Sequence, residues 1–402
     1  MTADTRVLAG RVRGLAAPTR FGAVLGAPPA DSIALTSGSP DVALLPAEQI
    51  AAATARVLAD PRRAAVALDY SHRPGHAGLR AWLAEREGVS VDRVVLTNGA
   101  LHALALPLLA VVEPGDVVVV ENPVYPLLLG VLQLTGARVE AVPTDADGLD
   151  VDALERRLAD GLRPRALYVV PDFQNPTGAT LSAPRRARLV ELAERYGFLV
   201  LSDNPYTALR WAGDRPADLD LGSDRVVHAN TFSKVFGPGL RLGWAVLPEW
   251  VTPGVLDLRA RTDQHASSLV QEIVADLVLV DDLYDVVAQR AASEYARRAA
   301  ALVEGLRAAL GTAVSVDLPD GGLFAWVHIG PGADALAARL GDHGVLVSPG
   351  SQFVVPGSPA ADGAAVAEHL RVSFARHGLD TLAEAVRRFT TAHARAALEV
   401  SR

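Results

Sequence analysis

Short runs of branched apolar residues alternate with segments of helical pattern through the middle of the chain. Six of these runs are typical of buried strands: residues 94–96, 117–120, 166–170, 198–202, 225–229 and 243–247. Between two of them, residues 183–196 have the features of a helix: Ser182 as N-cap, Pro184 in the first turn and Gly197 at the end. Strands that alternate with helices predict a mostly parallel α/β sheet with helices on both faces, a three-layer domain.

The pattern changes after about Val280. Long helices rich in Ala and Arg follow, with short strands around residues 324–326 and 370–374, so we expect a second, smaller α+β domain. The first 50 or so residues lack the alternating pattern and are expected to pack with that domain. The predicted division is residues 1–60 for an N-terminal arm and part of the small domain, 61–290 for the large domain, and 291–402 for the C-terminal small domain.

Polar clusters follow five of the predicted strands. They are Thr97-Asn98-Gly99, Glu121-Asn122-Pro123, Phe173-Gln174-Asn175, Asp203-Asn204 and Thr231 to Lys234. In open α/β sheets, ligands bind beyond the carboxyl ends of the strands. The five loops are therefore predicted to meet at one edge of one sheet and to form a site there.

Composition narrows the class of protein. Half of the 402 residues are hydrophobic and 21% are charged, which is typical of a globular chain. The net charge is −8 with both signs interspersed, so neither nucleic acid nor a membrane surface is expected as a partner. The chain has no cysteine, which excludes disulfides, thiolate nucleophiles and Cys-bound metals. The mixed charges of the first 20 residues predict that they are not a secretory leader, and the longest apolar stretch is too short to span a bilayer. We therefore expect a cytoplasmic protein without a bound metal.

Lys234 is the only lysine in the chain. A buried lysine can act as an amine nucleophile, which arginine cannot do. A GC-rich coding background that favours Arg is the alternative explanation, but the flanking residues argue against chance. The hydroxyls of Thr231 and Ser233 and the guanidinium of Arg241 suit a bound phosphate, and Lys234 suits a Schiff base beside it.

Pyridoxal 5′-phosphate (PLP) needs such a lysine, a phosphate site and an acid at its ring nitrogen. Asp203 is the candidate acid, and Tyr206 and Asn175 are candidates to bind the phenolic oxygen of the ring.

With these residues in this order, the chain resembles the fold-type I, class I/II PLP-dependent aminotransferases. It is most similar to the branch with 2-aminoadipate and kynurenine aminotransferases and the catalytic halves of MocR-type regulators. The resemblance spans roughly residues 30 to 380. Its motifs, in chain order, are Gly38-Ser39-Pro40, Tyr70 to Gly75, Thr97-Asn98-Gly99, Glu121 to Tyr125, Pro171 to Gly178, Ser202 to Tyr206, Thr231-x-Ser233-Lys234 with Pro238 to Arg241, Gly321 to Phe324, and Arg371 to Phe374.

The resemblance implies a role for each matching residue. Lys234 would form the internal aldimine and later move the substrate proton, Asp203 would bind the ring nitrogen, and Tyr206 and Asn175 the ring oxygen. Tyr125 would stack on the ring, and Arg371, with Asn175 and Gly38, would hold the substrate carboxylate. The phosphate would be held by Thr231, Ser233, Arg241, the amides of Gly99, Ala100 and Leu101, and Tyr70 of a partner subunit, which implies a homodimer with shared sites.

Two departures from the family pattern bear on function. Ala100-Leu101-His102 replaces a more polar set after the phosphate turn, and the Tyr70 loop carries His72, Arg73 and His76. Arg20 and Phe21 are further candidates to line a substrate pocket. The alternative for the candidates in this paragraph is an ordinary structural or exposed position in a loop or helix.

The leading hypothesis is an aminotransferase that moves an amino group between an L-amino acid and a 2-oxo acid. The alternative keeps PLP and changes the reaction to lyase, substitution, cyclisation or carbon–carbon bond-forming chemistry of specialised metabolism. A third hypothesis is a PLP-sensing regulatory domain. We expect it to be the weakest, because only about 30 residues precede the first motif.

Overall fold

The computed structural model describes residues 9, 12 and 31–400. Arg20 and Phe21, two of the candidates for a substrate pocket, lie outside the described residues.

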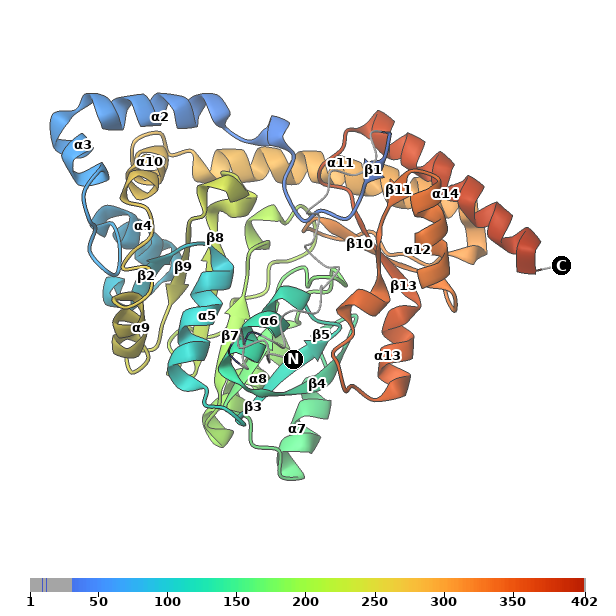
Figure 1. The fold of residues 1–402 in the computed structure, drawn as a ribbon, viewed down its shortest axis with the longest axis horizontal. Coiled ribbons are helices and arrows are strands. Elements are labelled where there is room, and N and C mark those ends of the chain that lie inside the picture. Colours follow the sequence, from blue (N-terminus) through green and yellow to red (C-terminus); the bar gives the residue numbers. More distant parts are fainter. Residues whose placement is uncertain (1–8, 10–11, 13–30, 401–402) are drawn as a thin grey trace, which may run out of the picture.

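A twisted eight-stranded sheet forms the centre of the larger part of the molecule, with the strand order β2-β9-β8-β7-β6-β3-β4-β5 (Figure 1). Its strands are β2 (Val94–Thr97), β3 (Val117–Asn122), β4 (Arg138–Asp145), β5 (Gly148–Leu149), β6 (Ala166–Val169), β7 (Leu199–Asp203), β8 (Val226–Thr231) and β9 (Gly243–Val246). The mostly parallel sheet expected from the sequence is confirmed.

Two strands run against the others. The two-residue strand β5 pairs antiparallel with β4, and β9 lies antiparallel between β2 and β8. The run at 243–247 gives no sign of this reversal, because a buried strand has the same composition in either direction. The reversal has a consequence for the site: the residues just before β9 lie at the same edge as the residues that follow β2 and β8.

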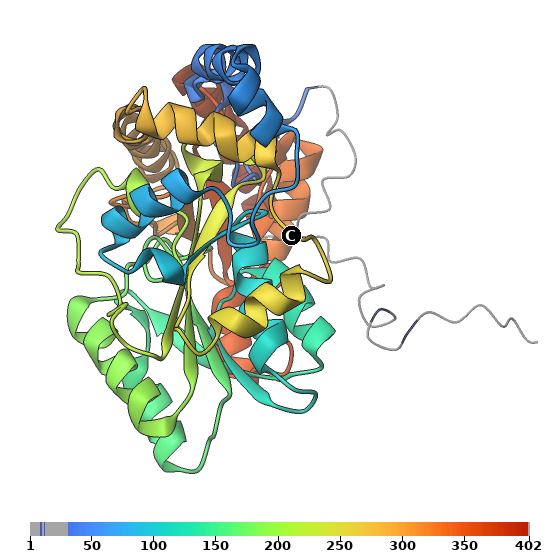
Figure 2. The same cartoon turned by 90° about the vertical axis from the view of Figure 1, so that its left-hand side faces the viewer.

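The central strands are mostly apolar because helices cover both faces of the sheet. In β3, Val118 and Val120 belong to one hydrophobic core and Val119 to the other. Helices α5, α6 and α9 pack in the first core, and α4, α7, α8 and α10 in the second, on opposite sides of the sheet in Figure 2. The helices of this larger part, including α2 and α3, are α2 (Ala47–Ala59), α3 (Pro61–Ala67), α4 (Ala77–Glu87), α5 (Ala100–Val111), α6 (Pro126–Thr135), α7 (Val151–Ala159), α8 (Ala183–Tyr196), α9 (Thr252–Arg259) and α10 (Ser268–Leu279).

Helix α8 matches the predicted bounds. It ends at Gly197, whose φ of 78° is the left-handed conformation that glycine adopts without strain. Ser182 occupies the N-cap position as expected, but its side chain makes no capping hydrogen bond.

A second, smaller part is built on the three-stranded antiparallel sheet β10-β13-β12. A separate parallel pair joins β1 to β11, so a segment from near the start of the described chain lies beside one from near its end. The strands and helices of this part are β1 (Ile33–Ala34), β10 (Phe324–His328), β11 (Val345–Leu346), β12 (Ser348–Pro349), β13 (His369–Ser373), α11 (Tyr284–Leu310), α12 (Ala333–Asp342), α13 (Ala360–Ala367) and α14 (Leu379–Val400). The boundaries at 60 and 290 stay predictions, and α11 passes through position 290.

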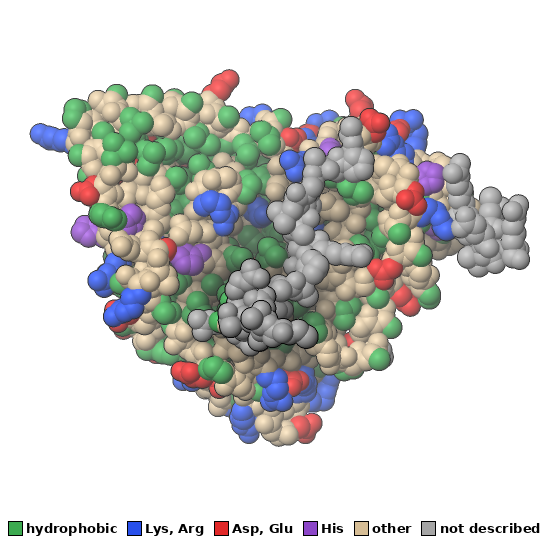
Figure 3. All heavy atoms as spheres, in the orientation of Figure 1, with side chains coloured by type: hydrophobic (Ala, Val, Ile, Leu, Met, Phe, Trp, Pro, Cys, Tyr) green, Lys and Arg blue, Asp and Glu red, His purple; other side chains and the backbone are tan. Residues whose placement is uncertain are grey.

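The face drawn in Figure 3 carries acidic and basic side chains intermixed, in line with the interspersed charges of the sequence. Among the described helices, none combines the length and the apolar character that a membrane crossing requires.

Candidate active site

A cavity of about 250 Å³ lies at the carboxyl edge of the central sheet. The ends of β2, β3, β6, β7 and β8 all contribute to it or adjoin it, as the polar clusters in the sequence predict. Its lining residues are Ala100, Leu101, Tyr125, Leu127, Tyr168, Val170, Asn175, Asp203, Pro205, Tyr206, Thr231, Ser233, Lys234 and Arg241.

One end of this cavity is built to receive an anion. Helix α5 starts after Gly99, which has no side chain to cap the free amides of the first turn, including those of Ala100 and Leu101. Arg241 faces them because β9 is reversed, and its Nη2 donates to the carbonyl of Asn98 at 3.0 Å. A Cβ on Gly99 would lie 2.8 Å from Arg241 Nη2, and φ there is 83°, so this turn requires glycine.

The hydroxyls of Thr231 and Ser233 adjoin the same end and contact each other at 2.8 Å. Thr231 Oγ1 also donates to the carbonyl of Leu242 at 3.0 Å and accepts from the amide of Ser233 at 3.1 Å. Thr231 therefore has a local capping function in this structure, the ordinary use of threonine at a turn.

Asp203 ends β7 on the floor of the cavity and is buried. Its Oδ2 accepts a hydrogen bond from the hydroxyl of Tyr168 at 2.8 Å, while its buried Oδ1 has no partner among the described residues. Burial raises the pKa of Asp203 to about 6, although the Tyr168 hydrogen bond and the charge of Lys234 oppose the shift. A buried carboxylate oxygen without a donor fits a ligand that brings its own N–H.

Sequence reasoning missed Tyr168. This tyrosine lies inside β6, and an aromatic residue is typical of a packed strand. The sequence pattern alone therefore indicates a residue of the hydrophobic core. Only the register between β6 and β7 shows that its hydroxyl reaches Asp203.

Lys234 lies in the 3₁₀ turn Phe232–Lys234 after β8. Its Nζ donates to the carbonyl of Gly38 at 2.8 Å and lies 5.5 Å from the ring centroid of Tyr206. Burial lowers the pKa of Lys234 to about 8; Asp203 opposes the shift, and the positive charges of Arg371 and Arg241 add to it. A larger fraction of this amine is neutral near pH 7 than for an exposed lysine, which makes it a better nucleophile.

The pKa of Lys234 leads to a pH prediction. In the protein without cofactor, the rate at which Lys234 bonds to a small aldehyde should rise about tenfold per pH unit up to about 8 and level off above it. The Lys234→Ala variant supplies the background from the N-terminal amine. A rate that keeps rising toward pH 10.5, the ordinary value for lysine, would contradict the lowered pKa.

Arg371 reaches the site from β13 of the small sheet. Its Nη1 donates to Asn175 Oδ1 at 2.7 Å and its Nη2 to the carbonyl of Thr36 at 2.5 Å. The guanidinium carbon lies 4.1 Å from the ring centroid of Phe324 and 4.9 Å from that of Phe353. Burial among these rings lowers the pKa of Arg371 to about 10, and the group remains cationic at neutral pH.

Asn175, Tyr206 and Tyr125 also line the cavity. Burial raises the pKa of Tyr206, whose hydroxyl hydrogen-bonds to Asn175, and burial raises the pKa of Tyr125 to about 12, so both phenols stay protonated. Gly38, whose carbonyl accepts from Lys234 Nζ, lies against Phe324, where a Cβ would approach Phe324 Cζ to 2.9 Å. The structure thus brings together the predicted site residues of this chain other than Tyr70.

Tyr70 lies outside the lining of the cavity. Its side chain is 81% exposed, contacts the ring of His265 edge-on at 5.9 Å and does not line the cavity of its own chain. His72, Arg73 and His76 do not line it either. His76 caps α4 through its Nδ1, which accepts from the amide of Leu79 at 3.0 Å, so its role here is structural.

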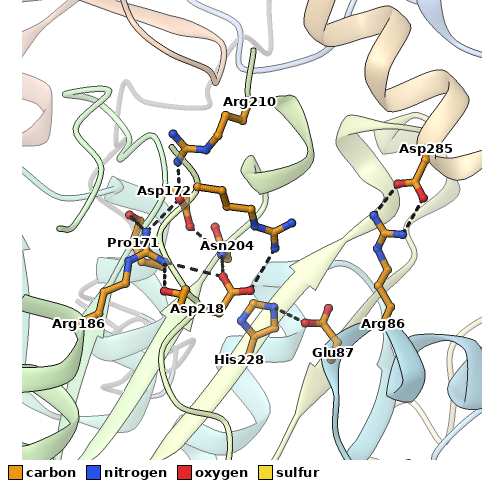
Figure 4. A network of polar contacts seen from close by, with 12 residues as sticks. Arg86, Glu87, Pro171, Asp172, Arg186, Asn204, Arg210, Asp218, His228 and Asp285 are labelled. Carbon is orange, nitrogen blue, oxygen red and sulfur yellow. Dashed lines mark hydrogen bonds and ion pairs between the residues drawn. The ribbon is translucent and has the colours of Figure 1, made fainter. Parts of the chain in front are cut away.

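A network of polar contacts joins the segments that follow β6 and β7 (Figure 4). Asp172, which follows β6, lies 3.0 Å from Arg186 and 2.8 Å from Arg210, and accepts from Asn204 Nδ2 at 3.1 Å. Asn204 is the residue after Asp203, so this network fixes the ends of β6 and β7 to each other. Sequence reasoning did not find it, because Arg186 and Arg210 come from distant segments.

Comparison with known proteins places the chain in a family. Residues 30–389 match the family model for aminotransferase class I and II. The chain is 32% identical to a 2-aminoadipate transaminase of Thermus thermophilus, over 89% of this chain and 88% of that protein. It is 32% identical to the uncharacterized HTH-type transcriptional regulator YdcR of Escherichia coli, over 80% of this chain and 70% of that protein.

A solved structure agrees with this placement. The kynurenine aminotransferase of Pyrococcus horikoshii, solved with PMP, KYN and KYA, superposes with a TM-score of 0.83 at 28% identity over 97% of this chain and 96% of that one. The chain therefore belongs to the class I and II aminotransferase family, whose enzymes are PLP-dependent and have the type I fold.

Among the described residues, no group of His, Cys, Asp or Glu is arranged to hold a metal ion.

Proposed function

We propose that this protein moves an amino group between an L-amino acid and a 2-oxo acid, with PLP held in the 250 Å³ cavity. One observation carries the proposal. The only lysine of the chain and the buried Asp203, with its unsatisfied Oδ1, line the same cavity, whose other end is formed by Arg241 and the N-terminus of α5. This donor set fits three of the polar groups of PLP: the aldehyde, the ring nitrogen and the phosphate.

When bound, PLP supplies an aldehyde and a ring that accepts electrons from the α-carbon of the substrate. Asp203 Oδ1 would accept the ring N–H, and its negative charge would keep that nitrogen protonated. Asn175 and Tyr206 would bind the ring oxygen, and Tyr125 would stack on the ring. The amides of Gly99, Ala100 and Leu101, with Arg241, Ser233 and Thr231, would bind the phosphate.

Lys234 and Arg371 would act on the substrate. Arg371 would clamp the α-carboxylate as a bidentate donor, and Asn175 and the backbone at Gly38 would assist. The flanking rings of Phe324 and Phe353 would exclude water from that ion pair and so strengthen it. Lys234 would first hold the cofactor and then, as the free amine, move a proton from the α-carbon of the substrate.

A panel assay tests this function. The protein loaded with PLP is mixed with each amino acid, and the absorbance of the lysine-bound cofactor and the release of 2-oxo acid are followed. At least one amino acid should convert the cofactor to its amino form, and a 2-oxo acid should restore it. The matching amines without the α-carboxylate should react poorly, because Arg371 has nothing to clamp. No conversion with any donor would overturn the proposal.

The alternative, another PLP reaction of specialised metabolism, rests on the altered Ala100-Leu101-His102 turn and on the His- and Arg-rich loop that carries Tyr70. His102 Nδ1 accepts the amide hydrogen of Asn98 at 3.2 Å, and His76 caps α4. These contacts give His102 and His76 structural roles within their own chain, and we keep transamination as the proposed reaction.

We also propose that the enzyme is a homodimer in which Tyr70 binds the phosphate in the partner subunit. Its exposure and its absence from the lining of its own cavity support this arrangement. The Tyr70→Ala variant should lose PLP about tenfold faster or more, the expected effect of removing a hydrogen bond to a charged group.

Mixed dimers test the sharing directly. In a dimer of one Tyr70→Ala chain and one Lys234→Ala chain, the site with an intact Lys234 receives its tyrosine from the other chain. Retention of PLP at that site should therefore return to the wild-type value. Retention as poor as in the Tyr70→Ala homodimer would show that Tyr70 serves its own chain.

A further inference from the structure

A cluster of polar side chains lies beneath the phosphate turn, outside the cavity lining. Its centre is Arg259, the last residue of α9, which is fully buried. Arg259 Nε and Nη2 donate to the two carboxylate oxygens of Asp263 at 3.2 and 2.9 Å. Its Nη1 donates to the carbonyls of Arg73, at 3.0 Å, and of Leu96. A buried guanidinium with this many partners fixes the segments that it joins.

Asp263 connects the cluster to the phosphate turn through Asn98. Its Oδ2 accepts from Asn98 Nδ2 at 2.8 Å. The amide of Asn98 donates to His102 Nδ1 at 3.2 Å, and its carbonyl accepts from Arg241 Nη2 at 3.0 Å. Asn98 is thus held by three groups, and one of them is the guanidinium that faces the anion site.

We infer that Asp263 and Arg259 are positioning residues for phosphate recognition, acting through Asn98 on Gly99, the start of α5 and Arg241. This inference deepens the proposed function and rests on it. Neither residue lines the cavity, so neither would touch a cofactor bound there. They hold the backbone that does, and they do so in a turn where Ala100 and Leu101 bring no polar side chain of their own.

The chemistry of the pair explains why a carboxylate is needed. Burial alone would raise the pKa of Asp263, but the hydrogen bonds and the charge of Arg259 lower it, so the group is ionised at neutral pH. Oδ1 accepts from Arg259 Nε, and Oδ2 accepts from Asn98 Nδ2 and Arg259 Nη2. In an Asp263→Asn variant one of the two oxygens becomes an NH₂ group, which cannot accept. At least one of the three contacts is therefore lost, together with the negative charge that pairs with Arg259.

The same segment supports the loop that carries Tyr70. Arg259 binds the carbonyl of Arg73, and His265 Nε2 accepts from the amide of Ser71 at 3.1 Å while its ring contacts Tyr70. In the proposed dimer, Arg259 and residues 263–265 therefore support both the phosphate turn of their own site and the tyrosine given to the partner's site.

The test compares PLP with pyridoxal, which has the aldehyde and the ring but no phosphate. Dissociation constants are measured by absorbance for the wild type, Asp263→Asn and Asn98→Ala, with Asp285→Asn as the control. Asp285 makes a similar carboxylate pair with Arg86, at 2.6 Å and partly exposed, away from the cavity. The ratio of the pyridoxal constant to the PLP constant reports the contribution of the phosphate alone.

We expect Asp263→Asn to lower this ratio by roughly 10- to 100-fold, the effect of losing a hydrogen bond to a charged group. Asn98→Ala, which leaves the Arg259–Asp263 pair intact, should lower it in the same direction, and Asp285→Asn should not change it. A merely structural role would weaken both ligands equally and leave the ratio unchanged, and that result would overturn the inference. If the wild type binds neither ligand, the proposed function itself fails.

Discussion

Replacement of Lys234 by alanine or arginine is expected to lower turnover by roughly 10⁴-fold or more, because the variant loses both the nucleophile and the acid–base group. Arginine is the informative substitution. It keeps the positive charge, and every other basic residue of this chain is arginine, but a guanidinium neither attacks an aldehyde nor takes a proton at neutral pH.

The measurement is single-turnover conversion of bound cofactor by a substrate from the panel. PLP should still bind to the alanine variant through Asp203 and the phosphate site, which separates loss of chemistry from loss of binding. A small primary amine in the buffer should restore part of the proton transfer in the alanine variant and none in the arginine variant. Turnover of Lys234→Arg within tenfold of the wild type would contradict the assigned role.

The second large effect is expected for Asp203→Asn, which should lower kcat by about 10²- to 10³-fold. The amide has no negative charge to hold the ring N–H, so the ring accepts electrons from the substrate less well. Tyr168→Phe is the matched control, because it removes only the hydrogen bond to Asp203 Oδ2 and leaves the charge. Its loss should be about tenfold or less.

Asp203→Asn should not lower the Tm of the protein without cofactor. A folded-state pKa of about 6, raised above the ordinary 3.8, means that the ionised carboxyl destabilises the fold above pH 6. Removing that charge relieves the cost, as expected where function is maintained against stability. A large fall in Tm together with the loss of activity would indicate that Asp203 serves the fold and not the cofactor.

Much of the site could be predicted because it depends on local sequence. A polar loop after a buried strand lies at the sheet edge whatever the rest of the chain does, so Asn175, Asp203 and Lys234 could be placed together before any coordinates. The isolation of Lys234 as the only lysine made its assignment stronger still.

The features that could not be predicted depend on contacts between distant segments. The reversal of β9, which places Arg241 opposite α5, leaves no mark in an apolar run. Tyr168 has the pattern of a core residue, and its contact with Asp203 follows from strand register. Arg259 and Asp263 lie more than 160 residues from Leu96 and Asn98, which they hold.

The most direct test of the account is borohydride reduction of the PLP-loaded protein followed by peptide mapping, with and without prior addition of an amino acid. Reduction fixes the cofactor to the amine that holds it, and the chain offers only one lysine. We predict one labelled peptide, the one containing Lys234, and loss of that label when a substrate amino acid is added first. Label only at the N-terminal amine, or label on Lys234 that no amino acid removes, would contradict the proposal that Lys234 holds PLP for transamination.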